Sequence, residues 1–416
     1  MTTPARPAHA TAWRNAVFAI FALNGLGAAT WAIRIPSIRD HLELSTSFVG
    51  YLILGVSIGS IIGLLLASHI IQWLGGRRSI VVMLVICSVA LVGIGLGTST
   101  LGSFAVVVVA MAVYGFGSAI CDVAMNVEGA AVEKAIGKTI MPLFHASWSA
   151  GMVIGTTIGT ALVFAHVDIA VHGIGMAVLL LLGAIIAPRA IPRVATHADT
   201  GEAVEHVSFR DRMGIWLEPR TLAIGLIALG MAFTEGSAND WLALSLVDER
   251  GLENGQAAAL FTLFTAAMMV GRIAGGPLID RFGRVTLLRI TGAAAAVGLA
   301  LVIFVPVIPV AIAGIVLWGL GASLGFPIAM SAAADDPARA AARVSAVATV
   351  GYTAFLVGPP LIGLVGENVG LMNALLIVFV LIVLATLAAP AARPPKSARG
   401  AGPTPASEPS ASESMS

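Results

Sequence analysis

Twelve continuous apolar runs of about 20 residues recur along the chain, and they decide which folds are possible. A helix of about 20 residues rises about 30 Å, the thickness of the hydrocarbon core of a bilayer. Only helices and closed barrels satisfy their backbone polar groups in lipid, and these runs do not alternate with a period of two. The chain is therefore predicted to be an all-α membrane protein with twelve transmembrane helices. The predicted spans are residues 14–36, 48–73, 79–98, 104–128, 145–165, 171–189, 220–244, 256–278, 285–305, 308–332, 343–366 and 370–390.

Composition excludes the water-soluble classes. Of the 416 residues, 58% are hydrophobic and 11% are charged, whereas soluble domains average roughly 25% charged residues. The sequence contains no metal-ligand cluster, nucleophile elbow or phosphate-binding loop. We therefore expect no enzyme activity, no cofactor, no metal and no nucleic-acid partner. The energy for transport of a solute against its gradient must then come from ion or solute gradients.

The basic residues predict how the chain is oriented. Nineteen of the 23 Lys and Arg residues fall in the tails and in every second loop. The positive-inside rule places such segments in the cytoplasm. We expect a multi-pass protein of the bacterial inner (plasma) membrane with both termini in the cytoplasm.

The chain divides into two halves of six spans. A polar insertion at 190–219 separates an N-terminal bundle, 1–189, from a C-terminal bundle, 220–390, and a Pro- and Ser-rich segment, 391–416, is predicted to be a disordered cytoplasmic tail. Shifting the sequence by a little over 200 residues aligns "GFGSAICDVAM", from Gly115, with "GLGASLGFPIAM", from Gly319. Two parallel repeats of this kind are typical of transporters with a solute site at mid-membrane between the halves.

Glycines four residues apart mark faces on which helices are expected to pack closely, because small residues let two backbones approach. They are Gly55, Gly59 and Gly63 in span 2, Gly151, Gly155 and Gly159 in span 5, and Gly271 and Gly275 in span 8.

The segment "GGPLIDRFGR", Gly275–Arg284, resembles the loop signature of the major facilitator superfamily. The resemblance extends over all twelve spans and implies alternating access between the two halves. The loop after span 2 has Gln72 where the family normally has Asp, and Ser68 where Gly is usual, which puts gating contacts in the N-terminal half in question. The residues that the resemblance assigns to gating are Arg77, Arg78, Asp280, Arg281 and Arg284.

A finer resemblance rests on five segments: "WAIRIPSI", "CDVAMNVEGAAVEK", "FHASWSAG", "EGSANDW" and "GYTAFLVGPPLIG". They are similar to the MosC-like and YbjJ-like branch of the superfamily, which is related to the fucose permeases. This resemblance implies transport of a sugar or an aminocyclitol. Span 4 lacks the Arg that typical drug antiporters carry there, so drug export is the less favoured interpretation.

Charged residues inside spans are the candidates for coupling, because each costs about 2.5–3.5 kcal/mol at a helix centre. Glu235 lies near the middle of span 7 and is the first candidate for a proton carrier. Asp122 is the second, and Asn126 shares its helical face. Alternatively, Asp122 is a structural cap or a cytoplasmic gate bonded to His145 or to backbone. His145 itself is either a charge switch or a structural histidine.

Other polar and aromatic residues are candidates for contact with a solute. Arg34 either extends to the membrane interface, pairs with Glu235 or Asp240, or binds the solute. Asn239 and Asp240 are expected to form an outer vestibule, and the aromatic residues either stack on a ring-shaped solute or belong to the core or interface. The predicted solute-binding residues are Asn24, Trp31, Arg34, Asn126, Trp148, Asn239, Asp240, Trp241 and Tyr352.

The preferred hypothesis is a monomeric secondary transporter that moves a small polar solute by alternating access, coupled to protons. One alternative is an exporter of hydrophobic or cationic compounds, favoured by the excess of acidic residues over Arg34 within the spans. Another is a receptor or regulator that does not transport, whose support is the atypical loop after span 2.

Overall fold

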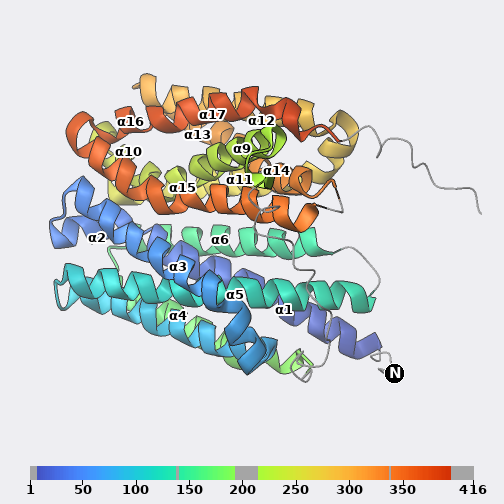
Figure 1. The fold of residues 1–416 in the computed structure, drawn as a ribbon. Helices are drawn as coiled ribbons and strands as arrows, with labels where there is room; N and C mark the ends of the chain where they lie inside the picture. Colours follow the sequence, from blue (N-terminus) through green and yellow to red (C-terminus); the bar gives the residue numbers. More distant parts are fainter. Residues whose placement is uncertain (1–6, 137–139, 193–213, 337–338, 395–416) are drawn as a thin grey trace, which may run out of the picture.

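The computed structural model describes residues 7–136, 140–192, 214–336 and 339–394, and these residues are almost entirely helical (Figure 1). Eleven helical segments are long and apolar enough to cross a membrane, and the shorter apolar segment Leu371–Leu387 supplies the twelfth. The prediction of an all-α protein with twelve transmembrane helices is confirmed.

The first half contains six spans. Its elements are α1 (Pro7–Ala32), α2 (Ile35–Leu42), α3 (Thr46–Leu74), α4 (Gly76–Ser99), α5 (Phe104–Ile136), α6 (Met141–Phe164), α7 (Ile169–Ile186) and η1 (Ala187–Ala190). Within this half α5 packs on α3 and α4, α6 packs on α1, and α7 packs on α4.

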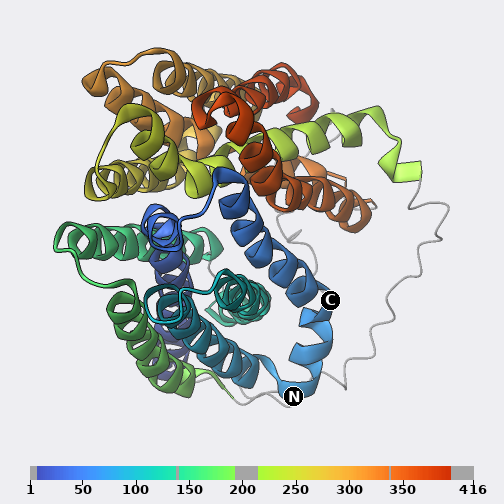
Figure 2. The same cartoon turned by 90° about the vertical axis from the view of Figure 1, so that its left-hand side faces the viewer.

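The second half repeats the arrangement. Its elements are α9 (Pro219–Ser237), η3 (Ala238–Leu242), α10 (Ala243–Arg250), α11 (Asn254–Phe282), α12 (Arg284–Phe304), α13 (Ile308–Ala322), α14 (Gly325–Ala333), α15 (Ala340–Val369), α16 (Leu371–Ala374), α17 (Leu376–Leu387) and η4 (Ala389–Ala392). The two groups of helices lie side by side (Figure 2), and they meet mainly where α6 packs on α11 and α3 packs on α15.

Four spans are interrupted where the sequence predicts continuous helices. Span 1 turns at Ile33 and Arg34 before Pro36, which lacks the N–H needed to continue the hydrogen-bond ladder. Span 7 passes through a π-helical stretch, η3, span 10 breaks at Ser323 and Leu324, and span 12 breaks at Leu375. These interruptions redirect side chains that helical periodicity alone places on other faces.

The glycine faces are confirmed as close helix contacts. A Cβ atom at Gly59 of α3 would lie 1.9 Å from the Ala112 carbonyl oxygen of α5. A Cβ atom at Gly151 of α6 would lie 2.0 Å from the Ala22 carbonyl oxygen of α1. Both distances are far below van der Waals contact, so these backbones approach closely only because the residues are glycine.

The start of α1 and the end of α17 lie at the same end of the bundle, which we call the terminal end (Figure 1). Most of the predicted linker, 193–213, and most of the predicted tail, 395–416, lie outside the described residues. The domain boundaries, and the side of the membrane on which the terminal end lies, therefore stay predictions.

Candidate functional site

An ion pair between α9 and α11 lies where the two halves meet. Arg272 Nη2 of α11 donates to both carboxylate oxygens of Glu235 on α9, at 2.9 Å and 2.8 Å. Arg272 Nη1 donates to Ser149 Oγ of α6, in the other half, at 3.2 Å. The side chains of Arg272 and Glu235 are 21% and 15% exposed, so both are mostly withdrawn from water. One guanidinium thus connects the acid of one half to the hydroxyl of the other.

Arg272 was not among the residues predicted for the site. The sequence places it inside span 8, and a basic residue there needs an acidic partner. The one partner considered for Glu235 was Arg34, and the structure corrects this, because Arg272 compensates the charge of Glu235. The signal available in the sequence was the pair itself, one acid and one base in neighbouring spans.

Arg34 does not pair with Glu235 or Asp240, nor does it extend to the interface, so both of these expectations are wrong. Its side chain is 4% exposed. Arg34 Nε donates to His172 Nδ1 at 3.1 Å, and Nη2 donates to the Val167 carbonyl oxygen at 2.9 Å. The turn that ends α1 directs Arg34 into the first half, toward α7, rather than toward the second half.

Asn24, Ser118 and Trp148 form a hydrogen-bonded cluster that joins α1, α5 and α6. Trp148 Nε1 and Ser118 Oγ each donate to Asn24 Oδ1 at 3.3 Å. Asn24 Nδ2 donates to the Ser118 carbonyl oxygen, also at 3.3 Å. Trp148 precedes Ser149, which accepts a hydrogen bond from Arg272. Helix α6 therefore contacts both this cluster and the Glu235–Arg272 ion pair.

Asp122 and Tyr352 approach each other from different halves. Asp122 of α5 and Tyr352 of α15 both have exposed side chains and lie within electrostatic range of each other. Asn126 Nδ2 donates to the Asp122 carbonyl oxygen at 2.9 Å, as their shared face predicts. The described residues show no hydrogen bond between Asp122 and His145, so His145 is not the partner of Asp122, and a role of Asp122 as a gate stays a prediction. His145 instead lies near Arg272 and edge-on to the Phe21 ring.

The π-helical stretch η3 holds Asn239, Asp240 and Trp241, one residue after another. Trp241 is 0% exposed, and neither its Nε1 nor Asn239 Oδ1 finds a hydrogen-bond partner. Trp241 therefore lies inside the bundle, whereas Asn239 and Asp240 are half-buried, and their place in a vestibule stays a prediction. Single π-turns inside α-helices are frequent at functional sites, because the extra residue re-aims the neighbouring side chains.

Polar contacts between the halves gather toward the end opposite the terminal end. Arg39 of α2 forms an ion pair with Asp248 of α10, and Asn254 Nδ2 donates to Asp40 at 2.8 Å. The Ser47 N–H donates to Glu367 at 2.9 Å. We call these three contacts the far-end lock. They hold α2 and α3 against α10, α11 and α15, so the structure is closed at this end.

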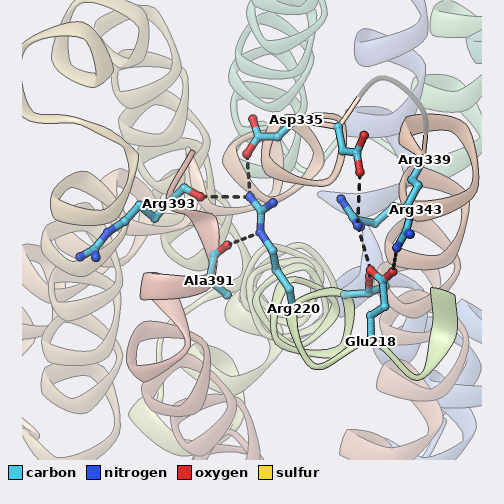
Figure 3. A network of polar contacts seen from close by, with 9 residues as sticks. Glu218, Arg220, Asp335, Arg339, Arg343, Ala391 and Arg393 are labelled. Atoms are coloured by element: carbon cyan, nitrogen blue, oxygen red, sulfur yellow. Dashed lines mark hydrogen bonds and ion pairs between the residues drawn. The ribbon is translucent and has the colours of Figure 1, made fainter. Parts of the chain in front are cut away.

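A charge cluster occupies the terminal end of the second half (Figure 3). Asp335 accepts from Arg220 at 2.8 Å and from Arg284 at 2.6 Å. Glu218 accepts from Arg339 and, at 2.8 Å, from Arg343. The hydrogen bond from Arg343 is the main reason that the pKa of Glu218 is held below its ordinary value of 4.5, and Thr221 and Arg339 add to the effect against the opposing cost of desolvation.

The first half has no matching cluster among the side chains that the structure describes. Glu128 accepts from Trp13 Nε1 at 3.1 Å, and Arg77 donates to the Ile191 carbonyl oxygen at 3.4 Å. Of the other residues assigned to gating, Arg281 lies 5.3 Å over the Phe282 ring, while Arg78 and Asp280 form no ion pair among the described residues. The asymmetry agrees with the atypical loop after span 2.

The family model described as Major Facilitator Superfamily matches residues 17–354 and 241–413. The chain belongs to the major facilitator superfamily. Its relatives within the superfamily include the "Uncharacterized transporter y4wD" of Sinorhizobium fredii (strain NBRC 101917 / NGR234), 31% identical over 91% of this chain and 98% of the relative. The "Membrane protein MosC" of Rhizobium meliloti is 28% identical over 88% of this chain and 87% of the relative. The predicted resemblance to the MosC-like branch is thereby confirmed.

Solved structures of major facilitator proteins share this fold. A point mutant of the nucleoside transporter NupG superposes with a TM-score of 0.73 over 92% of this chain and 99% of that chain, at 14% identity. A D-xylose-proton symporter superposes with a TM-score of 0.70 over 92% of this chain and 97% of that chain, at 15% identity. Family membership makes this chain a secondary transporter of the membrane that binds small molecules, and not an enzyme.

Proposed function

We propose that this transporter carries a small polar, polyhydroxylated solute through the contact zone of its two halves, coupled to protons. It works in the inner membrane with both termini in the cytoplasm. Because one chain supplies both halves, a monomer contains all the parts that this proposal needs.

The observation that carries the proposal is the position of Arg272, between Glu235 in its own half and Ser149 in the other. A proton on Glu235 would remove the negative charge that holds the guanidinium. Arg272 would then be free to bind a hydroxyl or carboxylate of the solute, and its link to α6 would loosen. Proton binding, solute binding and movement of the halves would thus act on the same side chain.

The surrounding side chains support a polar solute rather than an apolar one. Asn24, Trp148 and Asp122 come from the first half, and Tyr352 comes from the second. Amide, carboxylate and phenol groups suit a solute with several hydroxyls, and an indole ring can stack on the apolar face of a sugar-like ring. The printed names of the structural relatives, a nucleoside transporter and a D-xylose-proton symporter, are compatible with such a solute.

The case for an exporter of hydrophobic cations is weakened by the same ion pair. That hypothesis relied on an excess of acidic residues within the spans, and Arg272 compensates one of them. Drug-susceptibility profiles of a strain that lacks the protein test this alternative, since raised sensitivity to amphiphilic cations would favour export over solute uptake.

Transport in proteoliposomes tests the proposal directly. Sugars, cyclitols and nucleosides are offered to the purified protein with and without an imposed pH gradient. We expect at least one of them to accumulate against its concentration gradient when the pH gradient is applied. Accumulation that ignores the pH gradient would contradict proton coupling, and a panel without any transported polyol would contradict the solute class.

A further inference from the structure

A small cavity lies inside the first half, between α1, α4 and α7, away from the ion pair of Arg272. It has room for about one water molecule. Trp31, Arg34 and His172 line it, and they are 9%, 4% and 2% exposed. Two residues predicted to contact the solute, Trp31 and Arg34, are therefore found at a separate buried position.

The polar nitrogens at this cavity are hydrogen-bond donors. Trp31 Nε1 has no partner, and an indole N–H only donates. His172 Nδ1 accepts from Arg34 Nε, so a neutral imidazole carries its proton on Nε2, which is also buried without a partner. The hydroxyl of Thr30, which also lines the cavity, already donates to the Leu26 carbonyl oxygen at 2.8 Å. A water molecule there would find few acceptors for its two hydrogens.

Arg34 brings a positive charge to the cavity, which Asp168 offsets only through space. Arg34 forms no ion pair with any carboxylate among the described residues. The acid that influences it most, Asp168, caps α7 by accepting from the Ala170 N–H at 2.7 Å. A buried cation without a paired charge is unfavourable unless some other anion neutralises it.

We propose that this cavity binds one small monatomic anion, such as chloride. The anion accepts hydrogen bonds from Trp31 Nε1 and His172 Nε2 and neutralises Arg34. The size of the cavity excludes sulfate, phosphate and carboxylates. Since α1, α4 and α7 all line the cavity, the bound anion strengthens the packing of the first half, and this role does not depend on which solute is transported.

Thermal stability in chloride tests the site. The full-length protein in detergent is titrated with sodium chloride that replaces sodium gluconate at constant ionic strength. We expect the melting temperature to rise by about 2–4 °C and to saturate, as it does when a ligand binds only the folded state. In Trp31→Phe, which keeps a ring but loses the N–H, the rise is expected to disappear.

Trp318→Phe is the matched control, because Trp318 of α13 is also fully buried with an unpartnered Nε1 but does not line this cavity. It is expected to keep the chloride response. Crystals of the unaltered protein grown in bromide should show anomalous density beside Trp31 Nε1, a result that needs no variant to fold. The absence of a saturable response, equal loss of it in both variants, or density for water alone would overturn the proposal.

Discussion

Arg272 Nη2 donates two hydrogen bonds to the carboxylate of Glu235, at 2.9 Å and 2.8 Å, where the two halves of the transporter meet. The third contact of the guanidinium, to Ser149, crosses between the halves. A carboxylic acid that gains a proton loses its ion pair, so the proposed coupling predicts that protonation of Glu235 loosens the contact between the halves.

Glu235→Gln is expected to abolish accumulation driven by a pH gradient while leaving exchange of solute across the membrane detectable. The amide keeps the size of the side chain but cannot take up a proton. Proteoliposome uptake at equal and unequal pH measures the difference. Glu43→Gln, at an exposed position after α2, is the control and should behave as the unaltered protein does. Undiminished accumulation in Glu235→Gln would show that another group carries the proton.

Glu235→Gln and Arg272→Gln should each lower the melting temperature, because each leaves one mostly buried charge without its partner. The double variant should recover part of the loss. We expect a coupling energy of about 0.5–3 kcal/mol from the double-mutant cycle. Strictly additive losses would mean that the two side chains do not interact in the folded protein.

Tyr352→Phe should weaken apparent solute affinity by about tenfold, the effect of losing one hydrogen bond to a charged or polar group. The phenol lies within electrostatic range of Asp122 across the two halves. The concentration dependence of initial uptake rates provides the measurement. Tyr51→Phe, on the exposed surface of α3, serves as the control, and an equal effect in both variants would remove Tyr352 from the site.

Opening of the far-end lock is expected to become easier in Arg39→Ala. The Arg39–Asp248 pair is partly exposed, so its contribution is about 0.2–1 kcal/mol, or roughly a 1.4- to 5-fold change in the closed-to-open ratio. Thiol labelling of a cysteine introduced at Thr262, which contacts Thr160 of the other half at 3.0 Å, reports the opening. Exchanging the two charges, in Arg39→Asp with Asp248→Arg, should restore slow labelling, whereas fast labelling in the exchanged variant would exclude the ion pair as the cause.

Acid should destabilise the terminal-end cluster through Glu218. Its pKa is lowered in the folded protein, so the carboxylate contributes stability above its unfolded pKa of about 4.5 and loses that contribution as the pH falls through the lower folded value. Melting temperatures recorded from pH 6 down to pH 3.5 should fall less steeply in Glu218→Gln than in the unaltered protein. Identical slopes would show that Glu218 does not take part.

The class of fold followed from the sequence because its determinants are local. The length and apolarity of each run, the spacing of Gly59 and Gly151 with their neighbours, and the repeat of "GFGSAICDVAM" are all properties of short segments, and the structure confirms the helices and the close glycine contacts. The excess of Lys and Arg in alternate loops is also a local property of the sequence. It predicts that both termini are cytoplasmic, and labelling experiments can test this orientation.

Only the tertiary structure decided which charges meet. Pairing of Arg34 with Glu235 was one expectation, but Glu235 pairs with Arg272 and Arg34 binds His172. The physical reason is that lipid and protein interior are both apolar, so the periodicity of a membrane span does not reveal which face it turns to its neighbours. The turn before Pro36 and the π-helical stretch at Asn239 rotate the following side chains further. Partners on different spans are therefore set by helix packing, which no single span encodes.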